Sequence, residues 1–374
     1  MIDPVGLETF LNKYWDEQPL VATGSATRNF DDLLTVSTVD ELLSTGQLKP
    51  PNIRLVRSGS PVDFLEQASE PPTIDVGKVA TAFHDGATVI VQQLHHWWYP
   101  IAVFCRQIEG VLGHPTQANA YLSPPSAQGL PLHHDTHDVF VLQASGSKHW
   151  RVYHPAEPLP LPHQWYDHLD RPDEEPAYSF TLHTGDVLYL PRGWRHEATT
   201  RREESLHLTI GVHVYTWIDA LRDALLDCDD ELELRRAVPP NGAPPAGLSE
   251  MFTSRLNPAD VALRMRRRFV GTRRPILHRH LEQLRDRTHL TAHGLVQRRA
   301  TVIADLDTNG DRPALRFEGK ELLFPPQSHA AIRFCHLATE PFTPADLPVL
   351  DDEGRLVLVR RLVMEGFLEI LEQD

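Results

Sequence analysis

In the first third of the chain, the spacing of hydrophobic residues alternates between the period of a helix and that of a strand. Apolar positions recur at helical spacing from Leu7 to Trp15 and between Pro100 and Gly113, which predicts two helices. Another helix is expected to begin at Thr38, because Thr38 and Glu41 have the spacing of a capping box. Short apolar runs predict strands at residues 18–21, 53–57, 87–92 and 119–125.

From there to about residue 216 the chain is rich in β-forming residues. Val139–Gln143 and Lys148–Tyr153 flank Ala144–Ser147, which we interpret as a hairpin turn. Residues 155–177, dense in Pro, Asp and Glu, predict a long loop. Further strands are predicted at 178–182, 187–190 and 206–215. Many short strands separated by turns are typical of a barrel or jelly roll.

After Trp217 the hydrophobic pattern becomes that of helices. Helices are predicted at 218–237, 258–270 and 275–287, with prolines between Pro239 and Pro245 interrupting the pattern. The C-terminal part predicts mixed structure, with a hairpin around 318–320, helices at 329–338 and 356–366, and a strand at 367–371. We therefore divide the chain into residues 1–217, 218–290 and 291–374.

Composition narrows the class of protein. The 374 residues are 41% hydrophobic and 23% charged, which is ordinary for a soluble globular chain. The formal net charge of −15 argues against nucleic-acid binding through overall electrostatics. Three cysteines lie far apart, which favours a reducing compartment over disulfides or a thiolate zinc site. With no visible signal peptide and no apolar run long enough to span a membrane, we expect a cytoplasmic protein without membrane association.

A histidine and a carboxylate two residues apart, His133 and Asp135, lead directly into the apolar run that begins at Val139. In a strand, residues i and i+2 share a face, so both side chains would point into the same space. Their neighbours His134, His137 and Asp138 do not form a pair with this spacing. A second pair, His168 and Asp170, lies in the polar loop and is set aside.

A third ligand is expected where a later strand returns alongside the first. Gly185–Asp186 begins such a strand, and Pro191 and Gly193 turn the chain before His196. Two histidines and one carboxylate on one face of an ion suit non-haem Fe(II), because a cosubstrate and O₂ can occupy the remaining positions. Zinc more often has four protein ligands, or three and a water. Spacing alone leaves open that these residues form an ordinary polar strand end.

Several blocks of residues, in order, resemble the JmjC oxygenases, and within them the ribosomal-oxygenase or cupin-like branch. The resemblance covers about residues 7–217 well and the remainder more loosely. Its N-terminal part rests on Phe10, Tyr14–Trp15 and Pro19–Leu20. The main blocks are Asn119-x-Tyr121, His133-x-Asp135, Lys148–Tyr153, Gly185–Asp186 with Leu188–Tyr189, Pro191-x-Gly193-x-x-His196, and Ser205–Thr209.

The resemblance implies an α+β fold. Its core would be a double-stranded β-helix of the cupin or jelly-roll type, followed by a helical dimerisation region and a C-terminal winged-helix-like domain. It implies that His133, Asp135 and His196 hold Fe(II). A homodimer is expected on the same basis.

The resemblance also implies a binding site for the cosubstrate 2-oxoglutarate beside the iron. Lys148 would bind the distal carboxylate, for which a charged amine is a suitable donor. Asn119 and Tyr121 match further cosubstrate contacts, and Thr209 is an inward-facing candidate. Some relatives carry serine where Gly211 aligns, so a contact at that position would be lost. His207 is expected to be packed or to support a ligand rather than to be a fourth ligand.

We therefore expect an Fe(II)- and 2-oxoglutarate-dependent protein hydroxylase that uses O₂, with an arginine or histidine of a ribosomal protein as its target. The alternatives are a JmjC oxygenase acting on another protein or peptide, and a non-catalytic cupin-like binding protein. Histone demethylation fits less well, because the C-terminal additions resemble those of the ribosomal branch. The intact triad and Lys148 argue against the non-catalytic alternative.

The C-terminal region is acidic, and we do not expect it to bind DNA. One basic cluster lies between Arg264 and Arg274. Its residues either form a solvated helix face or contact the acidic remainder, or they make an interaction surface for ribosomal RNA or an acidic partner.

Overall fold

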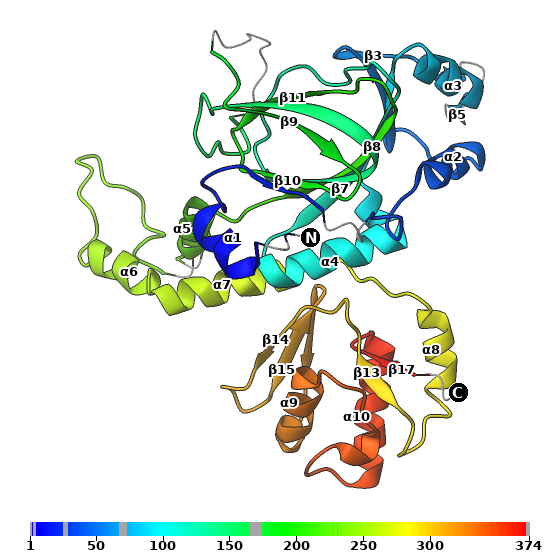
Figure 1. The fold of residues 1–374 in the computed structure, drawn as a ribbon. Coiled ribbons are helices and arrows are strands. Elements are labelled where there is room, and N and C mark those ends of the chain that lie inside the picture. Colours follow the sequence, from blue (N-terminus) through cyan, green and yellow to red (C-terminus); the bar gives the residue numbers. More distant parts are fainter. Residues whose placement is uncertain are drawn as a thin grey trace. The chain divides into compact units, whose positions relative to one another are not determined.

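The computed structural model describes residue 2 and residues 5–24, 29–66, 73–164, 174–226, 228–229 and 231–371. The pair His168 and Asp170 lies outside these residues. The chain divides into two compact units, Met1–Val214 and Tyr215–Asp374, and both are drawn in Figure 1. The further division at residue 290 stays a prediction. Among the helices described, none combines the length and apolarity that a membrane crossing requires.

Ten strands of unit 1 form one curved sheet in the residues described. Eight of them follow the order β1 (Leu20–Ala22), β10 (Val187–Leu190), β8 (Asp138–Tyr153), β12 (Ser205–Val212), β7 (Thr116–Ser123), β6 (Thr88–Val91), β2 (Ile53–Arg57) and β3 (Ser60–Pro61). The other two, β9 (Tyr178–His183) and β11 (Arg195–Thr199), pair with the second half of β8. The strands thus curve around an interior, as the many short strands predicted (Figure 1).

The predicted hairpin at Ala144–Ser147 is wrong, because β8 continues without a break from Asp138 to Tyr153. Its first half pairs with β10 and β12, and its second half pairs with β9 and β11. The strand bends between the two halves, where Gly146 has a φ of 65°. A Cβ at Gly146 would lie 2.0 Å from the carbonyl oxygen of Glu204, so the bend requires glycine. The Ser-Gly-Ser pattern therefore marks a bend and not a chain reversal.

Helices and short segments cover the sheet of unit 1. They are α1 (Leu7–Lys13), α2 (Val36–Ser44), α3 (Val76–His84), α4 (Tyr99–Leu112), the 3₁₀ turn η1 (Leu94–His96), and the short pair β4 (Leu65–Glu66) and β5 (Thr73–Ile74). Helix α2 begins at Val36, two residues before the predicted start at Thr38, because the Thr35 side chain caps it by accepting from the N–H of Thr38. Helix α3 and strand β11 were not predicted. The apolar faces of these helices join the sheet in one core.

Unit 2 consists of helices followed by two small sheets. Its elements are α5 (Trp217–Leu226), α6 (Leu248–Arg255), α7 (Pro258–Gly271), α8 (His280–Asp286), β13 (Val296–Arg298), β14 (Ala304–Asp307), β15 (Ala314–Phe317), β16 (Lys320–Leu323), η2 (Pro326–Ser328), α9 (His329–Leu337), η3 (Pro344–Asp346), α10 (Asp352–Glu365) and β17 (Leu368–Ile370). Strand β13 pairs with β17, and β14, β15 and β16 form the second sheet. The predicted hairpin around 318–320 is confirmed as β15–β16.

The predicted helix over 218–237 is too long, since α5 ends at Leu226. Beyond it the apolar positions become sparse, and the backbone turns through short-range hydrogen bonds such as the one from the N–H of Asp229 to the carbonyl of Leu226. Helix α6 was not predicted, because its sequence shows little apolar periodicity. The core of this unit lies between the small sheets, α9 and α10.

The basic cluster faces acidic neighbours within unit 2. Arg267 pairs with Asp307 at 2.7 Å, and Arg268 pairs with Asp223 at 2.9 Å. Arg266 donates to the carbonyl of Ala304 and lies 3.5 Å from a carboxylate oxygen of Asp305. These contacts favour the interpretation that the cluster serves the packing of unit 2.

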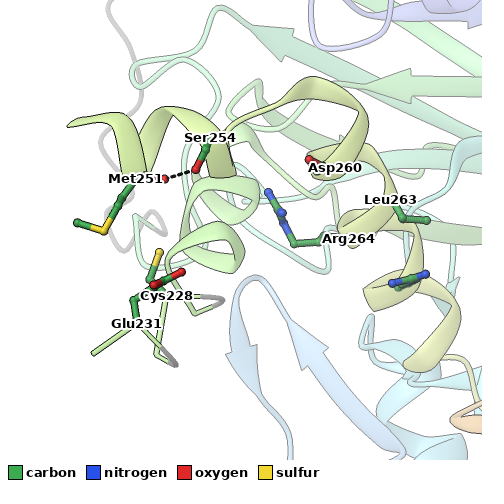
Figure 2. Close-up of a pocket in the computed structure, with 8 residues that line it drawn as sticks. Cys228, Glu231, Met251, Ser254, Asp260, Leu263 and Arg264 are labelled. Atoms are coloured by element: carbon green, nitrogen blue, oxygen red, sulfur yellow. Dashed lines mark hydrogen bonds between the residues drawn. The ribbon is translucent and has the colours of Figure 1, made fainter. Parts of the chain in front are cut away.

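A hollow of about 450 Å³ lies among α6, α7, Cys228 and Glu231 of unit 2 (Figure 2). Its lining places the acids Glu231 and Asp260 together with Arg264 and Arg267. This mixture of opposite charges favours no single class of ligand.

Candidate metal centre

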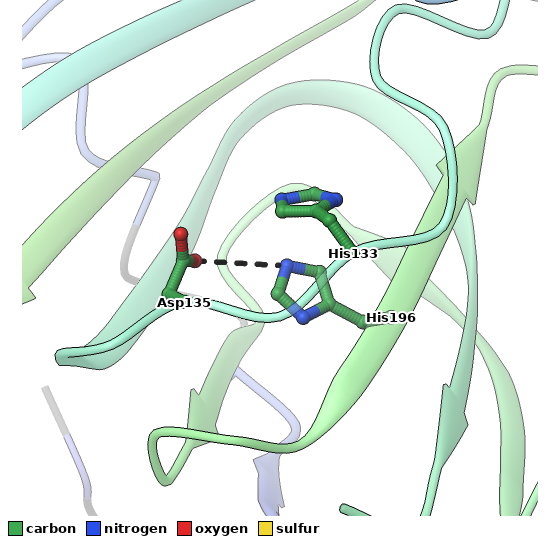
Figure 3. A group of neighbouring side chains, drawn as sticks. All are labelled: His133, Asp135 and His196. Atoms are coloured by element: carbon green, nitrogen blue, oxygen red, sulfur yellow. Dashed lines mark ion pairs between the residues drawn. The ribbon is translucent and has the colours of Figure 1, made fainter. Parts of the chain in front are cut away.

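The three predicted ligands come together at one end of the unit 1 interior. His133, Asp135 and His196 each offer a ligand atom, and these atoms lie within 4.8 Å of one another (Figure 3). The Nε2 atom of His196 is 3.8 Å from Oδ2 of Asp135, and the two imidazole centroids are 4.4 Å apart. Residues far apart in sequence thus form a compact set of two nitrogens and one oxygen.

Backbone hydrogen bonds hold the ligand-bearing segments side by side. His133 and His196 form an antiparallel β-bridge, in which each backbone N–H donates to the other residue's carbonyl. The N–H of Gly193, in the turn before β11, donates to the carbonyl of Asp135 at 3.0 Å. The turn that the sequence predicted from Pro191 and Gly193 therefore brings His196 beside the His-x-Asp segment.

Each histidine has one ring nitrogen engaged with the backbone. The Nδ1 atom of His133 lies 2.8 Å from the carbonyl oxygen of Pro131, and Nδ1 of His196 lies 3.0 Å from that of Trp194. Since a carbonyl can only accept, each Nδ1 carries the proton and each Nε2 keeps a free lone pair. This tautomer is the one that metal-binding histidines use.

The charges around the site suit a divalent cation. Burial would raise the pKa of Asp135, but the surrounding histidines, above all His137 and His133, hold it below its ordinary value. Burial and the neighbouring His133 lower the pKa of His196 to about 4. At neutral pH the site therefore contains an ionised carboxylate and a neutral His196 imidazole, both competent to bind a metal.

A pocket of about 200 Å³ extends from the triad into the interior. Tyr121, Lys148 and Thr209 line it together with the three ligands, as predicted. Asn119 is not among the lining residues. Its side chain accepts from the N–H of Gln93 and hydrogen-bonds to Tyr121, so it supports the pocket wall.

Lys148 is the buried cation of this pocket, with only 4% of its surface exposed. Its Nζ donates to the hydroxyl of Ser123 at 2.9 Å, and this hydroxyl lies 2.9 Å from that of Thr88. Within the part of the chain that the structure describes, no carboxylate pairs with it. Burial alone lowers its pKa to about 7.

Aromatic rings form the wall between Lys148 and the triad. Tyr121 and His207 stack in parallel with centroids 4.8 Å apart, and Trp150 meets His207 edge to face at 5.7 Å. Burial and the charge of Asp135 raise the pKa of Tyr121 to about 12, so its hydroxyl stays protonated and can donate. Burial and the charge of Lys148 lower the pKa of His207 well below its ordinary value. His207 is therefore a packed, neutral residue, as expected.

Trp150 and Arg54 are among the lining residues of the pocket that sequence reasoning missed. Trp150 stands two residues after Lys148 in β8, so the alternation of a strand would have placed it on the same face. The Nε1 atom of Trp150 and the Nδ1 atom of His207 are buried, and neither has a hydrogen-bond partner among the described residues. Arg54 faces the pocket because β2, β6 and β7 align it with Ile90 and Tyr121.

His134, His137 and Asp138, which the sequence spacing disfavoured as ligands, are not part of the triad. His134 contacts the carbonyl of Gln164, and His137 stacks with His213 at 5.1 Å. Asp138 is fully buried and pairs with Arg192. The ring of His137 occupies the space beside Gly211, where a Cβ would lie 2.5 Å from it.

Comparison with known proteins agrees with this geometry. Residues 95–220 match the JmjC domain family, a stretch that contains the triad and Lys148. Mouse ribosomal oxygenase 2 is 30% identical over 243 residues, which are 60% of this chain and 49% of that protein. The bifunctional lysine-specific demethylase and histidyl-hydroxylase NO66 of Drosophila persimilis is 26% identical over 249 residues, 64% of this chain and 36% of its own. This chain thus spans less than half the length of these relatives.

Among solved structures, that of Escherichia coli YcfD, described as a ribosomal oxygenase in complex with cobalt and 2-oxoglutarate, matches with a TM-score of 0.58. The match covers 98% of both chains at 20% identity, which establishes the likeness of the fold. The chain thus contains a JmjC domain within residues 95–220 and is similar to the ribosomal oxygenases.

Proposed function

We propose that this chain is an Fe(II)- and 2-oxoglutarate-dependent protein hydroxylase. The observation that carries the proposal is the unpaired, buried Lys148 in the same pocket as the His133, Asp135 and His196 triad. A buried cation without a counter-charge is costly to the folded chain, and an acidic ligand would offset that cost. The pocket thus combines a site for a metal with a site for a carboxylate.

The triad fits a divalent iron ion. His133 and His196 present Nε2 and Asp135 presents a carboxylate oxygen, the donor set of non-haem Fe(II) oxygenases. Iron bound there would couple the oxidative decarboxylation of 2-oxoglutarate, to succinate and CO₂, with transfer of one oxygen atom from O₂ to a substrate C–H bond.

The remaining pocket residues suit 2-oxoglutarate. Lys148 would donate to the distal carboxylate, and the protonated hydroxyl of Tyr121 would add a second donor. Thr209 lines the same pocket and would contribute its hydroxyl. The stacked rings of Tyr121 and His207 limit the access of water to the bound acid.

The substrate is proposed from the relatives. The matched proteins are named as ribosomal oxygenases and as a bifunctional lysine-specific demethylase and histidyl-hydroxylase. We therefore propose an arginine or histidine side chain of a ribosomal protein as the target. An acidic chain with a net charge of −15 also suits the basic character of such partners.

The first test measures succinate release from 2-oxoglutarate with Fe(II) and O₂. The chain is expected to turn over 2-oxoglutarate, and His133→Ala and Asp135→Ala are expected to abolish turnover. His134→Ala is the control, because this neighbour points to Gln164 instead of the triad. Retained turnover in either triad variant would refute the metal assignment.

Mass spectrometry of ribosomal proteins from cells lacking the gene then tests the proposed substrate, because a hydroxylated protein should lose a single added oxygen in those cells.

We also propose that the chain forms a homodimer through its helical region. Trp217, Leu221 and Leu225 are large apolar residues of α5 that stay exposed, whereas Ala220 and Ala224 of the same helix are buried. A contiguous apolar stripe of this kind favours a protein partner.

The winged-helix-like nature of residues 291–374 stays a prediction, supported by the two helices and small sheets found there. A cytoplasmic location is supported by three buried, free cysteines.

A further inference from the structure

A buried polar network lies close to the metal centre, and its side chains have no role in the proposed mechanism. It consists of Asp138, Tyr189 and Arg192, with Asp16 at its edge. Asp138 and Tyr189 are fully buried, and Arg192 is 6% exposed. Burying these polar groups is costly unless each finds a partner, so their arrangement demands a structural reason.

The hydrogen bonds of the network satisfy both oxygens of the Asp138 carboxylate. Its Oδ1 accepts from the backbone N–H and from the guanidinium of Arg192, each at 3.1 Å. Its Oδ2 accepts from the Tyr189 hydroxyl at 2.5 Å, and the oxygen of that hydroxyl accepts from the N–H of Asp16 at 3.1 Å. The Arg192 guanidinium also pairs with the Asp16 carboxylate. The donor and the acceptor of each of these hydrogen bonds are therefore defined.

The network connects the two segments that carry the metal ligands. Asp138 is the first residue of β8 and follows Asp135 by one short turn. Arg192 lies in the turn between β10 and β11, shortly before His196. The Asp138–Arg192 contact thus links the two segments through their side chains. The His133–His196 bridge and the Gly193–Asp135 hydrogen bond already link them through the backbone.

We propose that Asp138 and Arg192 are positioning residues, which hold Asp135 and His196 at the separation that an ion requires before the ion binds. This inference rests on the proposed metal site. A preorganised site avoids the free-energy cost of ordering its ligands during binding, and supporting residues of this kind typically change metal affinity by about 10- to 100-fold. The alternative is that the network stabilises unit 1 in general and has no specific effect on the triad.

Asp138→Asn separates these alternatives, because it keeps the side chain's volume. In either orientation its amide NH₂ meets a group that donates in the native chain. The matched control is Glu109→Gln. Glu109 belongs to another buried pair of unit 1, with Arg106 at 3.0 Å, and it accepts from the N–H of Thr116. Both residues of that pair lie on α4, and Thr116 begins β7, so the pair belongs to neither ligand-bearing segment.

The experiment titrates the full chain with Co(II) alone and follows the visible absorption of the bound ion, while urea unfolding measures stability separately. Asp138→Asn is expected to bind Co(II) about tenfold more weakly than wild type and to change the absorption spectrum. Glu109→Gln is expected to lose stability but to keep its Co(II) affinity within about twofold, since no ligand-bearing segment is affected.

An unchanged affinity in folded Asp138→Asn, or an equal loss in Glu109→Gln, would overturn the positioning role alone. Failure of the wild-type chain to bind Co(II) would instead refute the proposed metal site and this inference with it. If Asp138→Asn does not fold, Tyr189→Phe is measured in its place. It removes one hydrogen bond to Asp138 and leaves the Arg192 contact, so a weaker but measurable loss of affinity is expected, and none would count against the proposal.

Discussion

The backbones of His133 and His196 exchange two hydrogen bonds, of 3.2 and 2.7 Å, and so place two imidazoles from distant parts of the chain beside each other. This bridge joins His196 of β11 to His133, which lies outside the named strands. Because main-chain groups make it, the separation of the two Cα atoms does not depend on how either side chain packs. The side chains then need only their Nδ1 contacts to Pro131 and Trp194 to point the free nitrogens together.

Lys148→Met is expected to weaken 2-oxoglutarate binding by at least tenfold and to stabilise the ligand-free chain. Binding weakens because the charged donor for the distal carboxylate is lost. Stability rises because methionine removes a buried, unpaired ammonium whose pKa is lowered to about 7. Each pKa unit corresponds to about 1.4 kcal/mol, so the gain should be a few kcal/mol. Calorimetry and urea unfolding test this, with Lys78→Met as the control for an exposed lysine.

The stability gain of Lys148→Met should depend on pH in a defined direction. The pKa of Lys148 is lower in the folded chain than in the unfolded one, so the stability it contributes is greatest above pH 10.5 and is lost as pH falls through 7. The advantage of the methionine variant should therefore be largest below pH 7 and shrink toward pH 10. A gain that is constant over this range would contradict the assignment.

Binding of 2-oxoglutarate should weaken as pH rises above 7. Lys148 must be protonated in the complex, whereas its pKa in the free chain is about 7. The affinity should therefore fall toward about tenfold per pH unit between pH 8 and 9, and binding should take up a proton. Calorimetry in buffers of different ionisation enthalpy measures that proton. Its absence at pH 8 would show that Lys148 is already charged before binding.

The losses of stability caused by Gly211→Ser and His137→Ala should not be additive, and the double variant should be more stable than their sum predicts. A side chain at Gly211 would meet the ring of His137, so the serine variant should lose about 1–3 kcal/mol of stability. In the double variant the ring is gone and Cγ of Gln117, at 3.1 Å, is the remaining close neighbour, so the combined loss should be smaller than the sum of the single losses. A double-mutant cycle by urea unfolding tests this. Additive losses would mean that the ring moves aside without cost.

The apolar stripe of α5 should control the oligomeric state. Leu221→Asp with Leu225→Asp places two charges on this stripe, which should convert a dimer into a monomer. Sedimentation equilibrium measures the mass. Leu281→Asp is the control, because Leu281 is a single exposed leucine of α8. If the wild-type chain is a monomer, or if the double variant remains a dimer, the proposed interface is wrong.

The sequence could bring together the residues of the candidate metal site because their signals are local. The i, i+2 spacing selected His133 and Asp135, although β8 begins only at Asp138, and a Pro-Gly turn led to His196. The hairpin at Ala144–Ser147 was predicted wrongly, because pairing of β8 with β9, β11 and β12 decides whether that segment bends or reverses. Arg54 was missed for a similar reason, since only the register across β2, β6 and β7 brings it to the pocket.

The continuity of β8 restricts which sequence changes the pocket can accept during evolution. One uninterrupted strand begins at Asp138, close to the candidate metal ligands, and later carries Lys148 and Trp150. A single inserted or deleted residue between Asp138 and Lys148 would reverse the facing of every side chain beyond it, and the lysine would leave the interior. Lineages can therefore alter the Lys148 end of the pocket by substitution but not by single-residue changes of length. The connections outside β8 remain free to lengthen, and new substrate preferences can arise there.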